Sequence, residues 1–255
     1  MPAFEVDGVA INYIDEGAGP PIVLVHGFAS SLHGNWRAPG WIDALTGAGR
    51  RVVALDCRGH GRSGKPHDPA AYAGARMPDD VVALMDHLGI ERADLMGYSM
   101  GGYISATLLT RYPQRFQSVV LAGIGDAVLR GWPRERSQAI AAAMTGQRVE
   151  GEQAEVAKGF RAFAQASGND LDALAAMQRA GRSGLDGEAL RRATLPVLVV
   201  VGDKDTLVGT GAALAAAIPG ARYVTVPGDH LTAVAAPEYK RAVTEFLEEH
   251  SPVAA

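Results

Sequence analysis

Gly97-Tyr98-Ser99-Met100-Gly101 is a G-x-S-x-G pattern that joins an apolar run at 92–99 to a segment of helical periodicity at 100–112. A turn from strand to helix at this point holds the serine in a strained backbone conformation. Glycines two residues away on either side remove the Cβ atoms that would collide there. The hydroxyl is then exposed above the edge of a sheet. The pattern predicts that Ser99 is a nucleophile, the alternative being a structural serine in a glycine-flanked turn.

A serine hydroxyl is a weak nucleophile unless a general base removes its proton, so the pattern requires a histidine elsewhere. In the chain order that accompanies such a turn the base comes last, and His230 and His250 both follow Ser99. His250 lies in the terminal run, whereas His230 follows an apolar run at 221–228. That position is at the carboxyl edge of the predicted sheet, where Ser99 also lies. We therefore predict that His230 is the base.

The base needs a carboxylate to hold its tautomer and to stabilise the imidazolium. Asp203 and Asp205 follow the apolar run at 195–202, and Asp126 follows an earlier one. We rank Asp205 first, Asp126 second and Asp203 third, because Asp203 is equally well placed to brace the turn.

Backbone amides beside the nucleophile are the expected donors to an oxyanion. His26-Gly27-Phe28 ends the apolar run at 21–25, and its glycine lets the chain turn so that the amide of Phe28 faces the site. The amide of Met100, directly after the serine, is the expected second donor. We interpret His26 itself as structural, hydrogen bonding the loop that carries Phe28.

Short apolar runs alternate with helical segments along most of the chain, which predicts an α/β fold with a mostly parallel sheet. Residues 3–16 indicate an antiparallel hairpin that turns at Asp7-Gly8. Further strands are expected at 21–27, 51–56, 92–99, 118–125, 195–202 and 221–228.

Residues 126–194 break this alternation, because they contain helical stretches and no strand pattern. We interpret them as a helical cap over one edge of the sheet, with 1–125 and 195–255 forming the core. Such a cap predicts an enclosed, mainly apolar pocket. Candidate pocket residues are Trp36, Trp132 and Phe160, although aromatic residues at such spacing more often belong to ordinary packing.

The composition favours a globular protein with a small-molecule substrate. Of 255 residues, 47% are hydrophobic and 20% charged, and the net charge of −4 offers no electrostatic footprint for nucleic acid or an anionic membrane. The single cysteine, Cys57, excludes an internal disulfide and any zinc site built on paired thiolates. The first residues lack a signal-peptide pattern and no apolar run is long enough to span a bilayer, so we expect a soluble, cytoplasmic protein, with homo-oligomerisation left open.

One further motif points elsewhere at first sight. Gly59-His60-Gly61-Arg62-Ser63-Gly64 matches the G-x-G-x-x-G of dinucleotide-binding proteins. Pro66 and Pro69 follow it in place of a helix, so no helix N-terminus is available for a pyrophosphate. No metal-binding spacing occurs either, and we expect neither a metal nor a cofactor.

Taken together, these motifs resemble the α/β-hydrolase superfamily over nearly the whole chain. They are His26-Gly27-Phe28, the loop at 56–63, the stretch at 97–102, the stretch at 202–205 and Gly228-Asp229-His230. The resemblance implies the α/β-hydrolase fold: a mostly parallel central sheet flanked by helices, with a small helical cap inserted before the penultimate strand. It also implies a triad in which Asp205 is the acid; members with the acid after the preceding strand would place it at Asp126.

The expected activity is that of a serine hydrolase that cleaves a small or medium carboxylic ester through an acyl-enzyme intermediate. The serine distinguishes this chain from haloalkane dehalogenase and epoxide hydrolase relatives, which use an aspartate nucleophile. Lactonases and carbon-carbon bond hydrolases resemble it as well, although the latter usually carry Asn where this chain has Tyr98. A non-catalytic ligand-binding protein on the same fold is the alternative of a different class.

Overall fold

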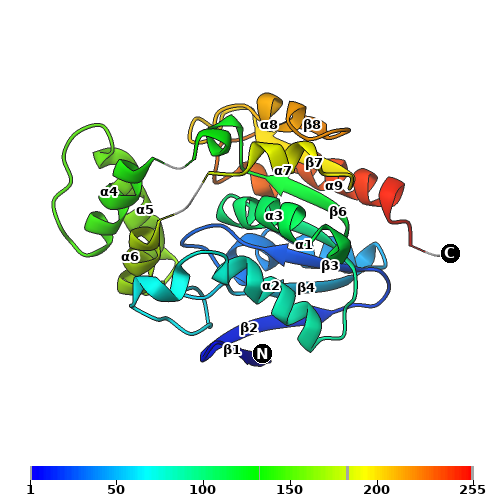
Figure 1. The fold of residues 1–255 in the computed structure, drawn as a ribbon, viewed down its shortest axis with the longest axis horizontal. Coiled ribbons are helices and arrows are strands. Elements are labelled where there is room, and N and C mark those ends of the chain that lie inside the picture. Colours follow the sequence, from blue (N-terminus) through cyan, green and yellow to red (C-terminus); the bar gives the residue numbers. More distant parts are fainter. Residues whose placement is uncertain (1, 132, 182–183, 254–255) are drawn as a thin grey trace.

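A computed structural model describes residues 2–131, 133–181 and 184–253. Within these residues the centre of the molecule is an eight-stranded sheet in the order β1-β2-β4-β3-β5-β6-β7-β8 (Figure 1). The strands are β1 (Ala3–Val6), β2 (Val9–Glu16), β3 (Pro21–Val25), β4 (Arg51–Leu55), β5 (Ala93–Tyr98), β6 (Phe116–Ala122), β7 (Val197–Gly202) and β8 (Arg222–Val226). The strands from β4 to β8 in this order pair in parallel, whereas β2 is antiparallel to both of its neighbours. The predicted mostly parallel α/β sheet is confirmed.

The N-terminal hairpin also forms as the sequence indicates. β1 and β2 pair antiparallel, with Val6 opposite Val9. The two residues between them, Asp7 and Gly8, both have positive φ angles, of 50° and 72°. Such a pair matches the right-handed twist of the strands that it joins.

Helices cover both faces of the sheet and create two separate apolar cores. One face carries α1 (Trp41–Gly47) and α9 (Pro237–His250), and the other carries α2 (Arg76–His87), α3 (Met100–Arg111) and α8 (Ala212–Ala216). Successive strand residues alternate between the two cores: Val23 faces the α2 and α3 side, and Leu24 faces the α1 and α9 side. Both are fully buried, which explains the continuous apolar runs in the sequence.

Between β6 and β7, the described residues form helices and no strand. These are a 3-10 turn (Asp126–Arg130), α4 (Arg134–Met144), α5 (Ala154–Ala166), α6 (Leu171–Ala180) and α7 (Gly187–Arg191). Figure 1 shows α4, α5 and α6 gathered at one end of the sheet, whereas α7 lies closer to α3. We call α4, α5 and α6 the insertion lobe. No helix among the described residues is both long enough and apolar enough to cross a membrane.

The end of β6 differs from its predicted position, at a place where the chain passes close to a distant loop. The apolar run continues to Gly125, but the strand ends at Ala122. Gly123 has a φ of 59°, and a Cβ on Gly125 would lie 2.3 Å from the carbonyl oxygen of Thr210. The chain therefore leaves the sheet early and passes tightly beneath the loop after β7.

Candidate active site

Ser99 occupies a strained turn between β5 and α3. Its φ and ψ angles are 55° and −112°, an unusual conformation for a residue other than glycine. A Cβ on Gly97 would lie 2.0 Å from the carbonyl oxygen of Gly101, and a Cβ on Gly101 would lie 1.9 Å from that of Val25. The two glycines of the G-x-S-x-G pattern are thus needed for close backbone approach. The strained turn predicted from the sequence is present.

Three side chains from separate loops form a continuous hydrogen-bonded row. The Oγ atom of Ser99 lies 2.9 Å from Nε2 of His230, and Nδ1 of His230 lies 2.7 Å from Oδ2 of Asp205. Because a carboxylate accepts from Nδ1–H, Nε2 is left to accept the serine proton. The carboxylate side chain is fully buried and its other oxygen accepts from the amides of Leu207 and Val208, at 3.1 and 3.3 Å.

The two other candidate acids have different partners. Asp126 accepts hydrogen bonds from the hydroxyl of Thr210 at 2.6 Å and the amide of Leu214 at 2.9 Å. Asp203 accepts from the amide of Gly228 at 2.9 Å and so braces the loop after β8. Among the described contacts, neither carboxylate reaches His230.

Two backbone amides beside Ser99 have no acceptor within the described chain. Met100 begins α3, so its N–H is one of the first four that a helix leaves without a partner. The hydrogen bonds of the described backbone include none from the amide of Phe28. A Cβ on Gly27 would lie 3.4 Å from Cβ of Ser99, which shows how closely the loop carrying Phe28 passes the serine.

That loop is held by three side chains from different parts of the chain. The Gly27 amide donates to Oδ1 of Asn35 at 2.9 Å, and the Gly27 carbonyl accepts from Nδ1 of His26 at 2.7 Å. Nδ2 of Asn169 donates to the carbonyl of Ala29 at 2.7 Å. His26 therefore braces this loop, as interpreted from the sequence, and Asn169 connects it to the segment before α6.

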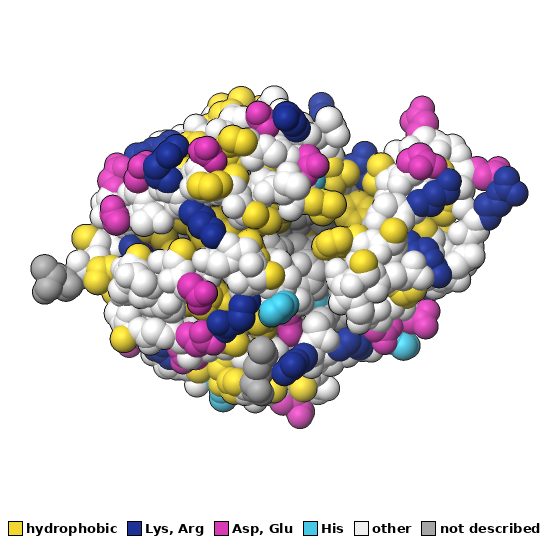
Figure 2. Space-filling model, turned by 180° about the vertical axis from the view of Figure 1, so that it is seen from behind, with side chains coloured by type: hydrophobic (Ala, Val, Ile, Leu, Met, Phe, Trp, Pro, Cys, Tyr) yellow, Lys and Arg dark blue, Asp and Glu magenta, His cyan; other side chains and the backbone are white. Residues whose placement is uncertain are grey.

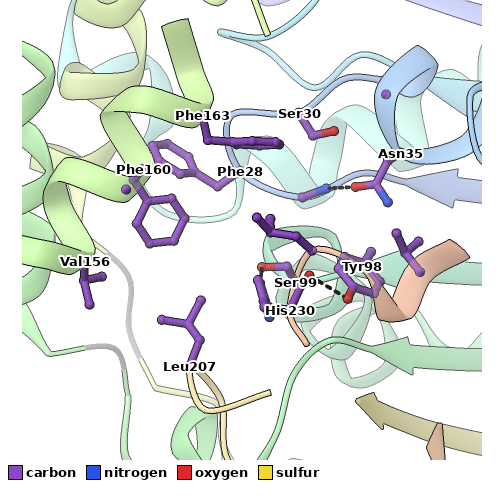
Figure 3. Close-up of a pocket in the computed structure, with 15 residues that line it drawn as sticks. Phe28, Ser30, Asn35, Tyr98, Ser99, Val156, Phe160, Phe163, Leu207 and His230 are labelled. Carbon is purple, nitrogen blue, oxygen red and sulfur yellow. Dashed lines mark hydrogen bonds between the residues drawn. The ribbon is translucent and has the colours of Figure 1, made fainter. Parts of the chain in front are cut away.

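A cavity of about 360 Å³ opens over Ser99 and His230. Figure 3 shows that α5 supplies Phe160, Phe163 and Val156 to one wall, with Leu207 nearby. Figure 2 shows the insertion lobe at the right of the molecule and hydrophobic side chains where it meets the larger body. The cavity is therefore walled jointly by the loops of the sheet edge and by the lobe. A larger cavity of about 740 Å³, near α2, α3 and α6, has neither Ser99 nor His230 among its described lining residues.

The three aromatic candidates for the pocket have different outcomes. Phe160 lines the cavity, and its ring meets that of Phe28 edge to face at 5.5 Å between centroids. The expectation for Trp36 is corrected: it is fully buried, packs against Trp41 in the core under α1 and α9, and does not line the cavity. Its ring belongs to the apolar core between the sheet and helices α1 and α9. Trp132 lies outside the described residues.

A profile of the alpha/beta hydrolase fold family matches residues 20–147, which include β3, β5 and the Ser99 turn. The chain belongs to this family. The solved structure of a hydrolase from Pseudomonas aeruginosa PA01 is similar at 33% identity, over 96% of this chain and 97% of that one, with a TM-score of 0.76. The enol-lactonase from Burkholderia xenovorans LB400 is similar at 29% identity, over 96% and 99% of the two chains, with a TM-score of 0.74.

The curated relatives match over a shorter stretch. Over 129 residues the chain is 40% identical to the dihydrolipoyllysine-residue acetyltransferase component of the acetoin cleaving system of Pseudomonas putida. The match covers 49% of this chain and 33% of that protein. This α/β hydrolase thus spans about a third of the length of the first curated relatives that it matches.

Tyr98 is a residue of this α/β hydrolase to which sequence reasoning assigned no role. Its hydroxyl donates to the backbone carbonyl of His230 at 2.8 Å, and the two rings lie 5.7 Å apart. Burial raises the pKa of Tyr98, and the charges of Asp205 and Asp229 add to that effect, so the hydroxyl keeps its proton. The sequence feature that could have indicated such a role is the position of Tyr98 inside the G-x-S-x-G pattern.

Asn35, the acceptor for the Gly27 amide, lies in a π-helical turn at His33–Arg37. The short segment has no apolar periodicity, so the sequence carried no signal for it.

Cys57 is buried and burial raises the pKa of its thiol, which removes it as a competing nucleophile. The described part of the chain contains no group of three or more His, Cys, Asp or Glu side chains arranged to hold a metal ion.

Proposed function

We propose that this protein is a serine hydrolase that cleaves a small or medium carboxylic ester through an acyl-enzyme intermediate. The observation that carries the proposal is the hydrogen-bonded row of Ser99, His230 and Asp205 at the floor of an apolar cavity. Nucleophile, base and orienting acid are then within hydrogen-bond reach of one another, as acyl transfer by a serine requires.

In this mechanism Oγ of Ser99 forms a bond to the ester carbonyl carbon while Nε2 of His230 takes its proton. The amides of Phe28 and Met100 stabilise the negative charge that develops on the carbonyl oxygen. His230 then gives the proton to the departing alcohol oxygen as the carbon-oxygen bond breaks. A water molecule, deprotonated by the same histidine, then bonds to the acyl carbon. The bond between that carbon and Oγ breaks, and Nε2 returns the proton to Oγ, which releases the acid and restores the serine.

Lactone hydrolysis is a second candidate, favoured by the similarity to the enol-lactonase of Burkholderia xenovorans. A lactone is an internal ester, so the same groups would act on it. The only difference is that the leaving alcohol stays attached to the acyl group.

A fluorophosphonate probe and the Ser99→Ala variant test the proposal. Ser99→Ala should fold normally and lose roughly 10⁴-fold to 10⁶-fold in kcat on p-nitrophenyl acetate, because the remaining groups cannot replace the nucleophile. The probe should label the wild type at Ser99, shown by peptide mass spectrometry, and should not label the variant. A folded wild-type protein that neither reacts with the probe nor hydrolyses esters or lactones would instead indicate a ligand-binding protein.

A further inference from the structure

Two cavities of different size meet at Ser99. The larger, of about 360 Å³, is lined by His230, whereas a smaller one, of about 40 Å³, is lined by Met100 and Gln178. Three residues line both: Phe28, Ser99 and Phe160. The serine therefore has a roomy side next to the histidine and a narrow side next to the start of α3.

Proton transfer decides which part of an ester occupies which side. The departing alcohol oxygen must come within hydrogen-bond reach of Nε2 of His230 to receive its proton. His230 lines only the larger of these two cavities. The alcohol part is thus directed to the larger cavity, and the acyl part, on the other side of the carbonyl carbon, is directed to the smaller one.

Gln178 gives the smaller cavity a distinct chemistry. It lies on α6 of the insertion lobe and is 5% exposed, and its carboxamide hydrogen-bonds with no described residue. The side chains around it are largely apolar and include Ile124, Val128, Ile140 and Val208. The carboxamide is not among the fully enclosed polar side-chain groups of the described residues that lack a partner, so it is open to the cavity and can hydrogen-bond with a ligand there. A few well-placed polar groups in an apolar pocket are the usual source of ligand orientation.

We propose that the smaller cavity binds the acyl part of the substrate and that Gln178 recognises a hydrogen-bonding oxygen on it. The inference rests on the proposed ester hydrolysis and narrows its substrate class. With a volume of only about 40 Å³, the cavity suits a short acyl chain. The preferred substrates are then esters of a short hydroxy or oxo carboxylic acid with an apolar alcohol.

A matched pair of esters tests the recognition of that oxygen. Benzyl 3-hydroxybutyrate and benzyl butyrate have the same alcohol and carbon chain and differ by one hydroxyl. For the wild type, kcat/KM should be about tenfold higher for the hydroxy ester, the size expected of one hydrogen bond to a buried amide. In Gln178→Met, whose side chain is unbranched and of similar length, this ratio should fall to one or below.

The matched control is Gln165→Met, since Gln165 is exposed on α5 and lines none of the cavities at Ser99. It should keep the wild-type ratio. Gln178→Leu serves as a second variant if Gln178→Met does not fold. A wild type that prefers benzyl butyrate, or a ratio that survives both substitutions of Gln178, would overturn the recognition.

Chain length tests the orientation independently. Rates on benzyl esters should fall steeply once the acyl chain exceeds about four carbons, whereas rates on alkyl acetates should tolerate much longer alcohols. The reverse pattern would place the acyl group in the larger cavity and overturn the proposal.

A binding measurement separates failure of this inference from failure of the proposed function. Calorimetry should show that wild-type protein binds 3-hydroxybutyrate about tenfold more tightly than butyrate, and that Gln178→Met binds the two acids equally. If the wild type hydrolysed no ester yet showed this preference, ester hydrolysis would be wrong and recognition by Gln178 would stand. Equal binding of the two acids by the wild type would contradict it whatever the activity.

Discussion

Asp203 and Asp205 lie two residues apart in one loop, yet their carboxylates have different hydrogen-bond partners. The side chain of Asp205 is fully buried against His230, and that of Asp203 turns to the amide of Gly228. By position alone either residue could be the acid that orients His230, because both follow β7 at the carboxyl edge of the sheet. The direction of each side chain is what distinguishes them.

This difference predicts the effect of removing each charge. Asp205→Asn keeps the shape of the side chain but favours the wrong tautomer of His230, so kcat on p-nitrophenyl acetate should fall on the order of 10⁴-fold. Asp203→Asn and Asp126→Asn should each cost far less, because neither carboxylate contacts the imidazole. Steady-state kinetics on the three variants measures these losses in kcat. A mild Asp205→Asn beside a crippled Asp126→Asn would move the acid to the loop after β6.

At the scale of elements, the C-terminal end of β5 connects two parts of the site. It delivers Ser99 to the turn before α3, and its last residue, Tyr98, donates a hydrogen bond to the carbonyl of His230 in the loop after β8. The strand that positions Ser99, the proposed nucleophile, thus also holds the loop that carries His230, the proposed base. Because β6 and β7 separate β5 from β8 in the sheet, this contact passes above two intervening strands.

Tyr98→Phe should loosen the histidine loop without removing any reacting group. The loss of one hydrogen bond should lower the free energy of unfolding by about 1 kcal/mol. The kcat should fall about tenfold with little change in KM, since displacing a catalytic group by 1 Å costs up to roughly 10²-fold. Urea unfolding and ester kinetics measure the two effects. Tyr223→Phe on β8, whose hydroxyl has no hydrogen bond among the described contacts, is the control and should alter neither.

At the scale of the whole molecule, a buried and uncharged histidine, His26, joins the loop beside Ser99 to the loop after β4. His26 is fully buried, donates from Nδ1 to the carbonyl of Gly27 and accepts at Nε2 from the amide of Cys57 at 3.0 Å. Burial lowers the pKa of His26, and the charge of Asp56 opposes this effect only in part. The folded state therefore requires the uncharged ring.

Stability should consequently fall as the pH is lowered. The unfolded chain protonates this histidine below about pH 6.5, whereas the folded protein resists protonation until lower pH. Acidification through this window favours unfolding by at most about 1.4 kcal/mol per pH unit for the one proton. Urea unfolding at pH 7.5, 6.5 and 5.5 measures the slope, and NMR should show that the His26 ring titrates at lower pH than a free imidazole.

Two variants isolate this contribution. His26→Gln should flatten the dependence of the free energy of unfolding on pH, although it lowers stability overall. His33→Gln, at an exposed histidine in the same region, should leave the slope unchanged. An ordinary titration of the His26 ring near pH 6.5 in the folded protein would contradict the argument.

Short-range features of this protein were readable from its sequence alone. The positive φ angles of the Asp7-Gly8 hairpin, the strained turn at Ser99 and the continuous apolar strands depend on steric limits and burial patterns that operate within a few residues. The chain order of strands and helices followed from the same patterns. The boundary of β6 was not readable in this way, because the residues after Ala122 pack against a loop more than eighty residues away in the sequence.

The tertiary structure alone decided which side chains meet. That His230 contacts Asp205, that Trp36 belongs to a core, and that Phe160 reaches the cavity all depend on the directions of side chains carried by distant segments. The contact of Tyr98 with the carbonyl of His230 joins residues 132 positions apart. Residue type and periodicity predict which helix, strand or loop carries a side chain and at which edge of the sheet it lies. Its partner is settled only when the elements pack, because packing brings together groups that have no local relation in the chain.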